Sequence, residues 1–421
     1  MLYRSVEYMV HKKAFLFPGQ GSQYIGMGKA LCEKYEIAKQ TFEEADDALG
    51  FSLSDMCFGG DLAELTLTKN AQPAILTTGV ATFRVLQERG ITPEIMAGHS
   101  LGEISALTCA GVFKFSDAVR LAQIRGTLMQ EAVPVGQGAM AAVMTRDTQM
   151  LEELCASVRE QDVLVISNYN TRTQQVISGH AGAVDRALEK LNEAEIKTKL
   201  LNVSAPFHCP LMEPAAKAFG EVLRDFEICE PKIPVLANIN AKPYGGADTV
   251  IDSLVQQIVN PVRWADSMTY LKKAMIKYCV EVGSGRVLKN MMKTNISDIP
   301  VYAFEGEEES LYDHFEACKF PIVSRAMGIA VATRNRNWDP DAYESGVVVP
   351  YKELTLMQTR IEQEERSATE EEIKRAIELL LTIFRTKETP AEEQRFRLHQ
   401  LFEDCGRMDL LKNFDDSVIG A

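Results

Sequence analysis

The residues best suited to chemistry form one pentapeptide, Gly98-His99-Ser100-Leu101-Gly102. A short apolar run, Ile95-Met96-Ala97, precedes it, and a stretch with helical character follows it. Strand, G-x-S-x-G and helix in this order form a nucleophile elbow, a sharp turn that exposes the serine hydroxyl. The N–H of Leu101 would then lie at a helix N-terminus, aimed at a developing oxyanion. The pattern predicts a nucleophilic Ser100. The alternative is a serine in an ordinary turn, because such a turn can contain the same G-x-S-x-G sequence.

A serine nucleophile needs a general base, and the sequence contains six histidines. His208 lies in the segment Pro206-Phe207-His208-Cys209-Pro210, where two prolines restrict the backbone. A neutral imidazole there could accept the Ser100 proton. A structural histidine is the alternative. Cys209 is a second conceivable nucleophile, but it lacks an elbow and adjoins His208, so we interpret it as a bystander.

One arginine lies where an apolar residue is expected. The predicted helix over 117–131, capped by Ser116, has an apolar stripe made of Ala118, Leu121, Ala122, Leu128 and Met129. Arg125 lies on this stripe, and an inward-facing guanidinium needs an anion or other hydrogen-bond partners. The position is typical of a socket that holds a substrate carboxylate through a bidentate contact. A snorkelling or structurally paired arginine is the alternative.

Composition limits the class of protein. The chain has 421 residues, which predicts two or three domains, and its formal net charge of −14 argues against general nucleic-acid binding. Nine cysteines without a C-x-x-C pair indicate neither a metal cage nor a disulfide framework, and favour a cytoplasmic protein. We expect no signal peptide, because residues 1–11 are mixed and polar, and no apolar run long enough to span a membrane.

The order of apolar runs and turns predicts an α/β, hydrolase-like core with a largely parallel sheet. Its first strand is expected over 13–17, a helix over about 26–39, and a longer helix from Pro73 to about 87. Residues 138–203 follow a β-α-β-β-α-β order, typical of an inserted ferredoxin-like subdomain. We therefore expect an α/β catalytic domain over 12–137 and 204–305, this subdomain, and a mostly helical extension over 320–421.

Six stretches together resemble the malonyl-CoA:acyl-carrier-protein transacylase family and the acyltransferase domains of polyketide synthases. In the family's order they are Phe17-Pro18-Gly19-Gln20-Gly21-Ser22-Gln23, Gly98-His99-Ser100-Leu101-Gly102-Glu103, Gln123-Ile124-Arg125-Gly126, Pro206-Phe207-His208, Asn260-Pro261-Val262-Arg263-Trp264 and Glu281-Val282-Gly283-Ser284-Gly285. The resemblance extends from about Ala14 to about Phe304. As a set these motifs are very specific.

The resemblance implies the reaction and the roles of the central residues. Ser100 would be the nucleophile that becomes an acyl ester, with His208 as its base. The main-chain N–H groups at Gln20 and Leu101 would form the oxyanion hole. Arg125 would pair with the free malonyl carboxylate.

The resemblance also implies two supporting roles. No acid completes the triad in this family, so the main-chain carbonyl of Gln257 would orient the histidine. Phe207 before the histidine resembles members that select malonyl units, because methylmalonyl-selecting members carry serine there. The implied reaction is a ping-pong transfer from malonyl-CoA to a phosphopantetheine thiol, with no metal or redox cofactor.

We recognise neither an Asp-Ser-Leu attachment motif of a carrier protein nor a second catalytic module in the chain, so the acyl carrier protein is expected as a separate partner. Carrier proteins are usually acidic, and docking should therefore use a local basic patch. The candidates are Lys197, Lys199, Arg286, Lys289 and Lys293. The alternative is that they are ordinary solvated lysines and arginines without a role in docking. No nucleic-acid or membrane partner is expected.

The resemblance does not cover the extension. There Thr369-x-x-Glu372 is a capping box, followed by an amphipathic stripe of Ile373, Ile377, Leu380, Leu381 and Phe384. Its helices could pack on the catalytic domain, or they could dock onto modules of a synthase. An extended, separate acyltransferase would suit a polyketide or hybrid polyketide–nonribosomal peptide assembly line. The alternatives are an acyl hydrolase that acts on carrier proteins, transfer of a substituted malonyl unit, and an inactive scaffold.

Overall fold

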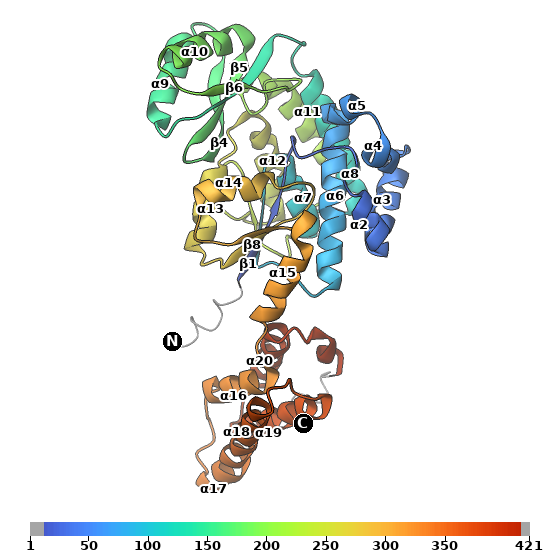
Figure 1. Cartoon of the computed structure of the whole chain (residues 1–421), viewed down its shortest axis with the longest axis vertical. Coiled ribbons are helices and arrows are strands. Elements are labelled where there is room, and N and C mark those ends of the chain that lie inside the picture. Colours follow the sequence, from blue (N-terminus) through green and yellow to red (C-terminus); the bar gives the residue numbers. More distant parts are fainter. Residues whose placement is uncertain (1–11, 414–421) are drawn as a thin grey trace. The chain divides into compact units, whose positions relative to one another are not determined.

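The computed structural model describes residues 12–413 and divides the chain into two compact units, Lys12–Leu311 and the residues from Tyr312 onward. Figure 1 shows an α/β arrangement in the first unit and helices alone in the second. The segment 1–11, for which we expected no signal peptide, lies outside the described residues. None of the helices within residues 12–413 has the length and apolar character that a membrane span requires.

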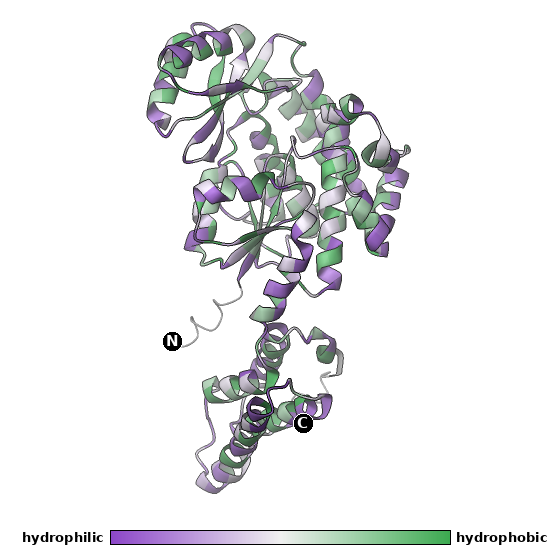
Figure 2. Cartoon of the chain, in the orientation of Figure 1, coloured by the Kyte–Doolittle hydropathy of each residue, from purple (hydrophilic) through white to green (hydrophobic). Residues whose placement is uncertain are grey.

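A five-stranded parallel sheet forms the centre of the first unit. Its strands, in the spatial order β7-β2-β1-β8-β9, are Val235–Leu236, Ile95–Gly98, Lys13–Phe17, Tyr278–Glu281 and Val301–Ala303. Strands β1, β2 and β8 are buried along their whole length, which explains their runs of apolar residues (Figure 2). The expectation of an α/β core with a parallel sheet is confirmed.

Helices surround this sheet, some of them in an outer layer that packs on other helices. They are α2 Lys29–Lys34, α3 Glu36–Leu49, α4 Leu53–Gly59, α5 Leu62–Thr66, α6 Thr68–Glu88, α7 Leu101–Cys109, α8 Phe115–Glu131, α11 Glu213–Leu223, α12 Val250–Val259, α13 Trp264–Lys273 and α14 Val287–Asn295. Helix α15, Phe304–Cys318, follows them and continues past Leu311, the last residue of this unit. Helix α6 is buried along most of its length and lies between the sheet and the outer helices α3 and α8 (Figure 1).

Three predicted helix boundaries were wrong. The single helix expected over 26–39 is two helices, because Gly26 and Gly28 take positive φ angles and Tyr35 is extended with φ −129° and ψ 120°. Helix α6 begins at Thr68 rather than at Pro73, which lies inside the helix. Helix α8 begins at Phe115 after Lys114, so Ser116 lies in its first turn and is not the cap.

Residues 138–200 form the inserted subdomain, with β3 Gly138–Val143, α9 Thr148–Val158, β4 Leu164–Thr171, β5 Gln174–His180, α10 Ala181–Glu193 and β6 Thr198–Leu200. The four strands are antiparallel in the order β4-β5-β3-β6. This order and the two helices match the predicted ferredoxin-like arrangement.

The second unit is helical. Its elements are α16 Ile322–Ala332, α17 Pro340–Tyr343, a π-helical turn Glu344–Val348, α18 Val349–Gln363, α19 Glu370–Thr386, α20 Ala391–Asp404 and a final 3₁₀ turn Met408–Asn413. The predicted capping box is present, since Thr369 Oγ1 accepts from the Glu372 N–H and Glu372 accepts from the Thr369 N–H. The predicted stripe of α19 is buried in a core that the helices of this unit build among themselves.

Candidate active site

Ser100 lies in a sharp turn between β2 and α7. Its φ of 52° and ψ of −107° are unusual for a residue with a side chain and are typical of a nucleophile elbow. The flanking glycines are required by close packing: a Cβ on Gly98 would lie 1.8 Å from the Gly102 carbonyl carbon, and one on Gly102 would lie 2.0 Å from the Phe17 oxygen. The turn can therefore form only because both positions lack a side chain.

The structure brings Ser100 and His208 together from positions 108 residues apart. Ser100 Oγ lies 2.8 Å from His208 Nε2, and His208 Nδ1 lies 2.8 Å from the main-chain oxygen of Gln257 on α12. A carbonyl oxygen only accepts hydrogen bonds, so Nδ1 carries the proton and Nε2 is left to accept the Ser100 hydroxyl proton.

His208 is only 4% exposed, and its backbone has a φ of 58° between the two prolines. Burial, followed by the nearby charge of Arg125, lowers the pKa of His208 from 6.5 to about 3. The imidazole is therefore neutral near pH 7, which is the form that a general base needs.

Arg125 is 1% exposed and faces the nucleophile from α8. Its Nη1 donates to Gln72 Oε1 at 2.8 Å, and its Nη2 donates to Gln257 Oε1 at 2.7 Å and to Ser100 Oγ at 3.3 Å. Its Nε is buried and finds no hydrogen-bond acceptor among residues 12–413. Burial lowers the pKa of Arg125 to about 10, so the group stays charged near pH 7.

The oxyanion-hole positions lie on two loops at the carboxyl ends of β1 and β2. Leu101 is the first residue of α7, so its N–H belongs to the unpaired donors of a helix N-terminus. Gln20 follows β1, and its side-chain Nε2 donates to Thr68 Oγ1 at 3.2 Å. Adjacent parallel strands end at the same edge of the sheet, which places both loops beside Ser100.

Phe207 and Cys209 flank the histidine and are both buried. Cys209 Sγ donates to the Pro206 carbonyl oxygen at 3.0 Å, and burial raises the pKa of its thiol. A thiol held in this way is mostly protonated, which agrees with its interpretation as a bystander.

Sequence analysis did not single out Asn238 or Glu103. Asn238 Oδ1 accepts from the Ser100 N–H at 2.8 Å, and its Nδ2 donates to the Gly98 oxygen at 2.6 Å. Asn238 follows β7, the neighbour of β2 in the sheet, so the parallel arrangement could have indicated it. Glu103 is buried in the first turn of α7, directly after the elbow, and accepts three hydrogen bonds.

The segment Gly283-Ser284-Gly285 leads into α14, and a glycine-rich joint before a helix can bind phosphate, but here the protein itself occupies the helix N-terminus. The buried carboxylate of Glu281 accepts from the Leu288 N–H at 2.9 Å and from the Lys289 N–H at 2.8 Å. This carboxylate satisfies the helix N-terminus that a phosphate would otherwise occupy.

The expectation that the chain lacks an Asp-Ser-Leu motif was wrong, because Asp252-Ser253-Leu254 on α12 has this sequence, which is typical of phosphopantetheine attachment in carrier proteins. It is part of the catalytic unit. Leu254 is fully buried, and the same helix supplies Gln257 to the site. The tripeptide therefore does not mark a carrier domain.

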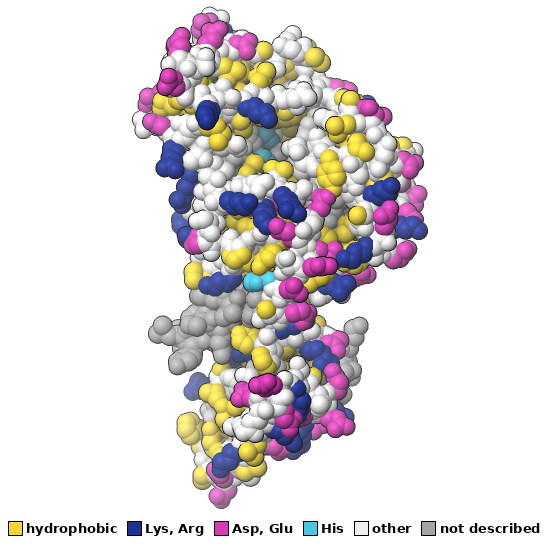
Figure 3. Space-filling view, viewed as in Figure 1, with side chains coloured by type: hydrophobic (Ala, Val, Ile, Leu, Met, Phe, Trp, Pro, Cys, Tyr) yellow, Lys and Arg dark blue, Asp and Glu magenta, His cyan; other side chains and the backbone are white. Residues whose placement is uncertain are grey.

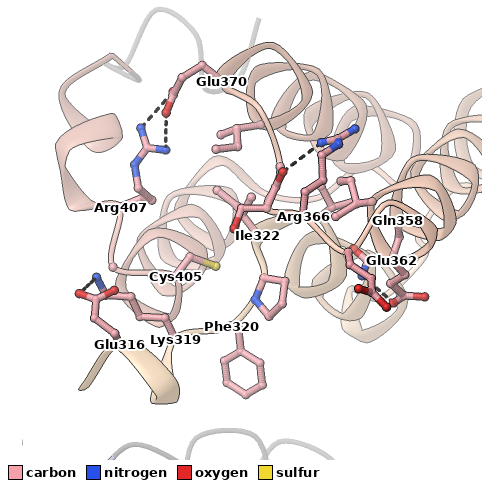
Figure 4. A pocket seen from close by; sticks show the side chains of 18 residues that line it. Glu316, Lys319, Phe320, Ile322, Gln358, Glu362, Arg366, Glu370, Cys405 and Arg407 are labelled. Atoms are coloured by element: carbon pink, nitrogen blue, oxygen red, sulfur yellow. Dashed lines mark hydrogen bonds and ion pairs between the residues drawn. The ribbon is translucent and has the colours of Figure 1, made fainter. Parts of the chain in front are cut away.

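A cavity of about 660 Å3 lies in the helical unit and is lined by residues of that unit alone (Figure 4). Among its lining residues, Arg407 pairs with Glu370 and Lys319 pairs with Glu316, whereas Arg366 pairs with Glu372 outside the lining. Ile322 and Cys405 also line the cavity. It contains neither an elbow nor a histidine, so it offers no counterpart to the pair of Ser100 and His208. Within residues 12–413, no group of three or more His, Cys, Asp or Glu side chains could hold a metal ion.

The five basic candidates for carrier docking differ in their surroundings. Lys289 forms an ion pair with Glu307, and Arg286 Nη1 lies 3.8 Å from the same carboxylate. Lys293 Nζ lies 3.4 Å from Asn290 Oδ1. Lys197 and Lys199 are exposed at β6. Figure 3 shows Lys and Arg side chains in separate groups on one face of the catalytic unit.

This sheet, with its elbow serine and paired histidine, defines an acyl transferase domain, and residues 14–309 match the acyl transferase domain family. A malonyl CoA-acyl carrier protein transacylase of Bacillus subtilis is 37% identical over 392 residues, which cover 90% of this chain and 98% of that protein. The Escherichia coli K12 enzyme of the same name is 43% identical over 292 residues, covering 69% of this chain and 94% of the relative.

Solved structures agree. An acyl carrier protein S-malonyltransferase from Vibrio cholerae superposes with a TM-score of 0.68 at 39% identity, over 69% of this chain and 96% of that one. A malonyl-transacylase in complex with a type II polyketide-synthase acyl-carrier protein gives 0.68 at 40% identity, over 69% and 95% of the two chains. The chain belongs to the malonyl CoA-acyl carrier protein transacylase family.

Proposed function

We propose that the chain transfers a malonyl group from malonyl-CoA to the phosphopantetheine thiol of a separate acyl carrier protein, through an acyl ester on Ser100. The names of its relatives support this substrate and this partner. One observation in the site carries the proposal. Arg125 is buried beside the nucleophile, its guanidinium contacts only neutral oxygen atoms, and its Nε still lacks an acceptor. A malonyl carboxylate would supply both the missing acceptor and the missing negative charge.

In the first half-reaction, Ser100 Oγ attacks the thioester carbonyl while His208 Nε2 takes the hydroxyl proton. The N–H groups of Gln20 and Leu101 stabilise the oxyanion, and one such donor is typically worth about a hundredfold to a thousandfold in rate. The carbon–sulfur bond then breaks, and the coenzyme A sulfur takes the proton from His208. This leaves a malonyl ester on Ser100.

In the second half-reaction, the carrier thiol gives its proton to His208 and its sulfur attacks the ester. The Ser100 oxygen leaves and recovers the proton, so the enzyme returns to its starting state without a metal or redox cofactor. The Gln257 main-chain oxygen stabilises the imidazolium in both halves, since it accepts from Nδ1. Phe207 adjoins the base and would limit the substituent at the malonyl α-carbon.

We infer further that the enzyme serves carrier proteins of a polyketide or hybrid polyketide–nonribosomal peptide assembly line, and that its helical unit contacts those modules. The unit has a core of its own, and the alignment with the Bacillus subtilis relative covers 90% of this chain, well past residue 309. Cytoplasmic action, where coenzyme A thioesters are available, agrees with the free thiols of Cys32, Cys57, Cys109, Cys155, Cys209, Cys229, Cys279 and Cys405.

The decisive experiment is intact-protein mass spectrometry after brief incubation with malonyl-CoA, methylmalonyl-CoA or acetyl-CoA. We expect labelling by malonyl-CoA to be much faster than labelling by acetyl-CoA or methylmalonyl-CoA. The malonyl adduct should be lost in Ser100→Ala and should transfer to an added holo carrier protein. Acetyl labelling as fast as malonyl labelling, or rapid release of free acid without a carrier, would instead support a carrier-protein acyl hydrolase. Comparing a fatty-acid carrier with an assembly-line carrier as acceptor tests the pathway.

A further inference from the structure

One buried acid beside the site has no part in the reaction described above. Glu103 is 0% exposed and lies in the first turn of α7, three residues after the nucleophile. It accepts from Gln257 Nε2 at 2.7 Å and from the Asn238 N–H at 3.1 Å, and the Tyr244 hydroxyl also donates to it. Burial of a carboxylate costs free energy, which hydrogen bonds from three donors offset. In return, the carboxylate holds the three donor groups in place.

The contact with Gln257 fixes which way that side-chain amide points. Glu103 accepts from the amide nitrogen, and so does the Ser100 main-chain oxygen at 2.9 Å. The amide oxygen is therefore turned toward Arg125 Nη2, 2.7 Å away. A guanidinium only donates, so the reversed amide would place N–H against N–H and break the contact with Arg125.

Gln257 thus joins three groups of the site. Its side-chain oxygen holds Arg125, its side-chain nitrogen holds the elbow through Ser100, and its main-chain oxygen holds His208. The residue that fixes Gln257 consequently affects both the base and the cation.

The interposed amide also preserves the charge of Arg125. A direct ion pair with Glu103 would neutralise the guanidinium and occupy its donors. With Gln257 between them, Glu103 is near enough to favour the charged form of Arg125, yet the guanidinium remains open to an external carboxylate.

We propose that Glu103 is a positioning residue which, through the side chain of Gln257, holds Arg125 in the orientation that selects acyl groups with a free carboxylate. This inference depends on the proposed function, because it assigns Arg125 to the malonyl carboxylate. Glu103 itself touches neither substrate nor the reacting atoms.

The test measures selectivity, which a purely structural role would leave unchanged. Initial rates of Ser100 acylation by malonyl-CoA and acetyl-CoA are compared by intact mass spectrometry for wild type, Glu103→Gln and Gln257→Met. We expect the malonyl-to-acetyl ratio to fall at least about tenfold in both variants, since one hydrogen bond to a charged group is at stake. Gln257→Met keeps the main-chain oxygen that holds His208, and it tests the proposal if Glu103→Gln does not fold.

Tyr244→Phe is the matched control, because it removes one donor to Glu103 and leaves the Gln257 contact in place. Its ratio should stay at the wild-type value. An unchanged ratio in Glu103→Gln and Gln257→Met, or an equal fall in Tyr244→Phe, would overturn the proposal. A wild-type enzyme that malonyl-CoA does not acylate would overturn the proposed function instead, so the two failures are distinguishable.

Discussion

The Nδ1 atom of His208 lies 2.8 Å from the main-chain oxygen of Gln257, at a place where many serine enzymes have a carboxylate. A neutral carbonyl fixes the tautomer as an acid would, but it adds no negative charge. Burial, followed by the nearby charge of Arg125, lowers the pKa of the imidazole, and the hydrogen bond to the Gln257 carbonyl only partly opposes this shift. His208 is therefore a weak base, but near pH 7 it is in the neutral form that can accept a proton.

The pH dependence of Ser100 reactivity follows from this lowered pKa. A base with a pKa of about 3 stays neutral from pH 8 down to pH 5, whereas an ordinary histidine would lose its basic form below about 6.5. We expect the rate of Ser100 modification by a sulfonyl fluoride, a reagent without a carboxylate, to be flat across that range. A fall in rate with a midpoint near 6.5 would contradict the environment described for His208.

Substitution of Arg125 should change substrate choice more than serine reactivity. Arg125→Ala removes the only cation whose contact with Ser100 Oγ, at 3.3 Å, is seen among the described residues. Loss of a charge-assisted contact predicts at least about tenfold to a hundredfold slower acylation by malonyl-CoA. The rate with acetyl-CoA, measured by the same mass-spectrometric assay, should fall less. Equal losses for both substrates would show that Arg125 acts as a structural residue.

Carrier docking should depend on Lys197 and Lys199 more than on Lys289, whose charge Glu307 already balances. The double variant Lys197→Glu/Lys199→Glu is expected to raise KM for the carrier protein several-fold at low salt, with less effect at high salt. Acylation by malonyl-CoA alone should be unchanged. Lys190→Glu, an exposed lysine on α10 of the same subdomain, is the control. If the control variant raises KM equally, net charge rather than a local patch governs docking.

Glu103 should also affect the pH dependence of stability. Burial raises its pKa from 4.5 to about 7, although hydrogen bonds from Tyr244, Gln257 and Asn238 and the charge of Arg125 oppose the shift. Between these two values the folded protein binds the proton more tightly, so its free energy of unfolding falls as pH rises from about 4.5 to about 7. Glu103→Gln cannot titrate, so its stability relative to wild type should improve over that range by on the order of a few kcal/mol. Urea unfolding at pH 5 and pH 8 measures this difference, and a constant difference would contradict it.

Sequence patterns predicted the fold correctly at those elements where burial or a tight turn determines the residue types. The apolar run of β1, the elbow with its two glycines and the β-α-β-β-α-β order of the inserted subdomain each leave a local pattern. Helix boundaries were less predictable, because burial extended α6 past Pro73 and an extended Tyr35 divided α2 from α3.

The residues of the site likewise divide into those that the sequence indicated and those that it did not. Ser100, His208 and Arg125 could be chosen from their own surroundings in the sequence, and the structure places them together. Glu103 and Gln72 could not be chosen, because their importance arises only when α6, α7 and α12 meet at the elbow. Asn238 could have been indicated only by its place after β7, the neighbour of β2 in the sheet. A buried polar residue that acts through another side chain has no spacing rule of its own.

The helical unit has a hydrophobic core whose buried residues, from Ile322 to Cys405, all belong to that unit. A calorimetric scan should therefore contain two melting events, and a single Tm would not describe the chain. Heat or a core substitution such as Leu380→Ala could melt the helical unit while the enzyme still forms its acyl ester. An assay of acylation alone would not detect the melting of the helical unit.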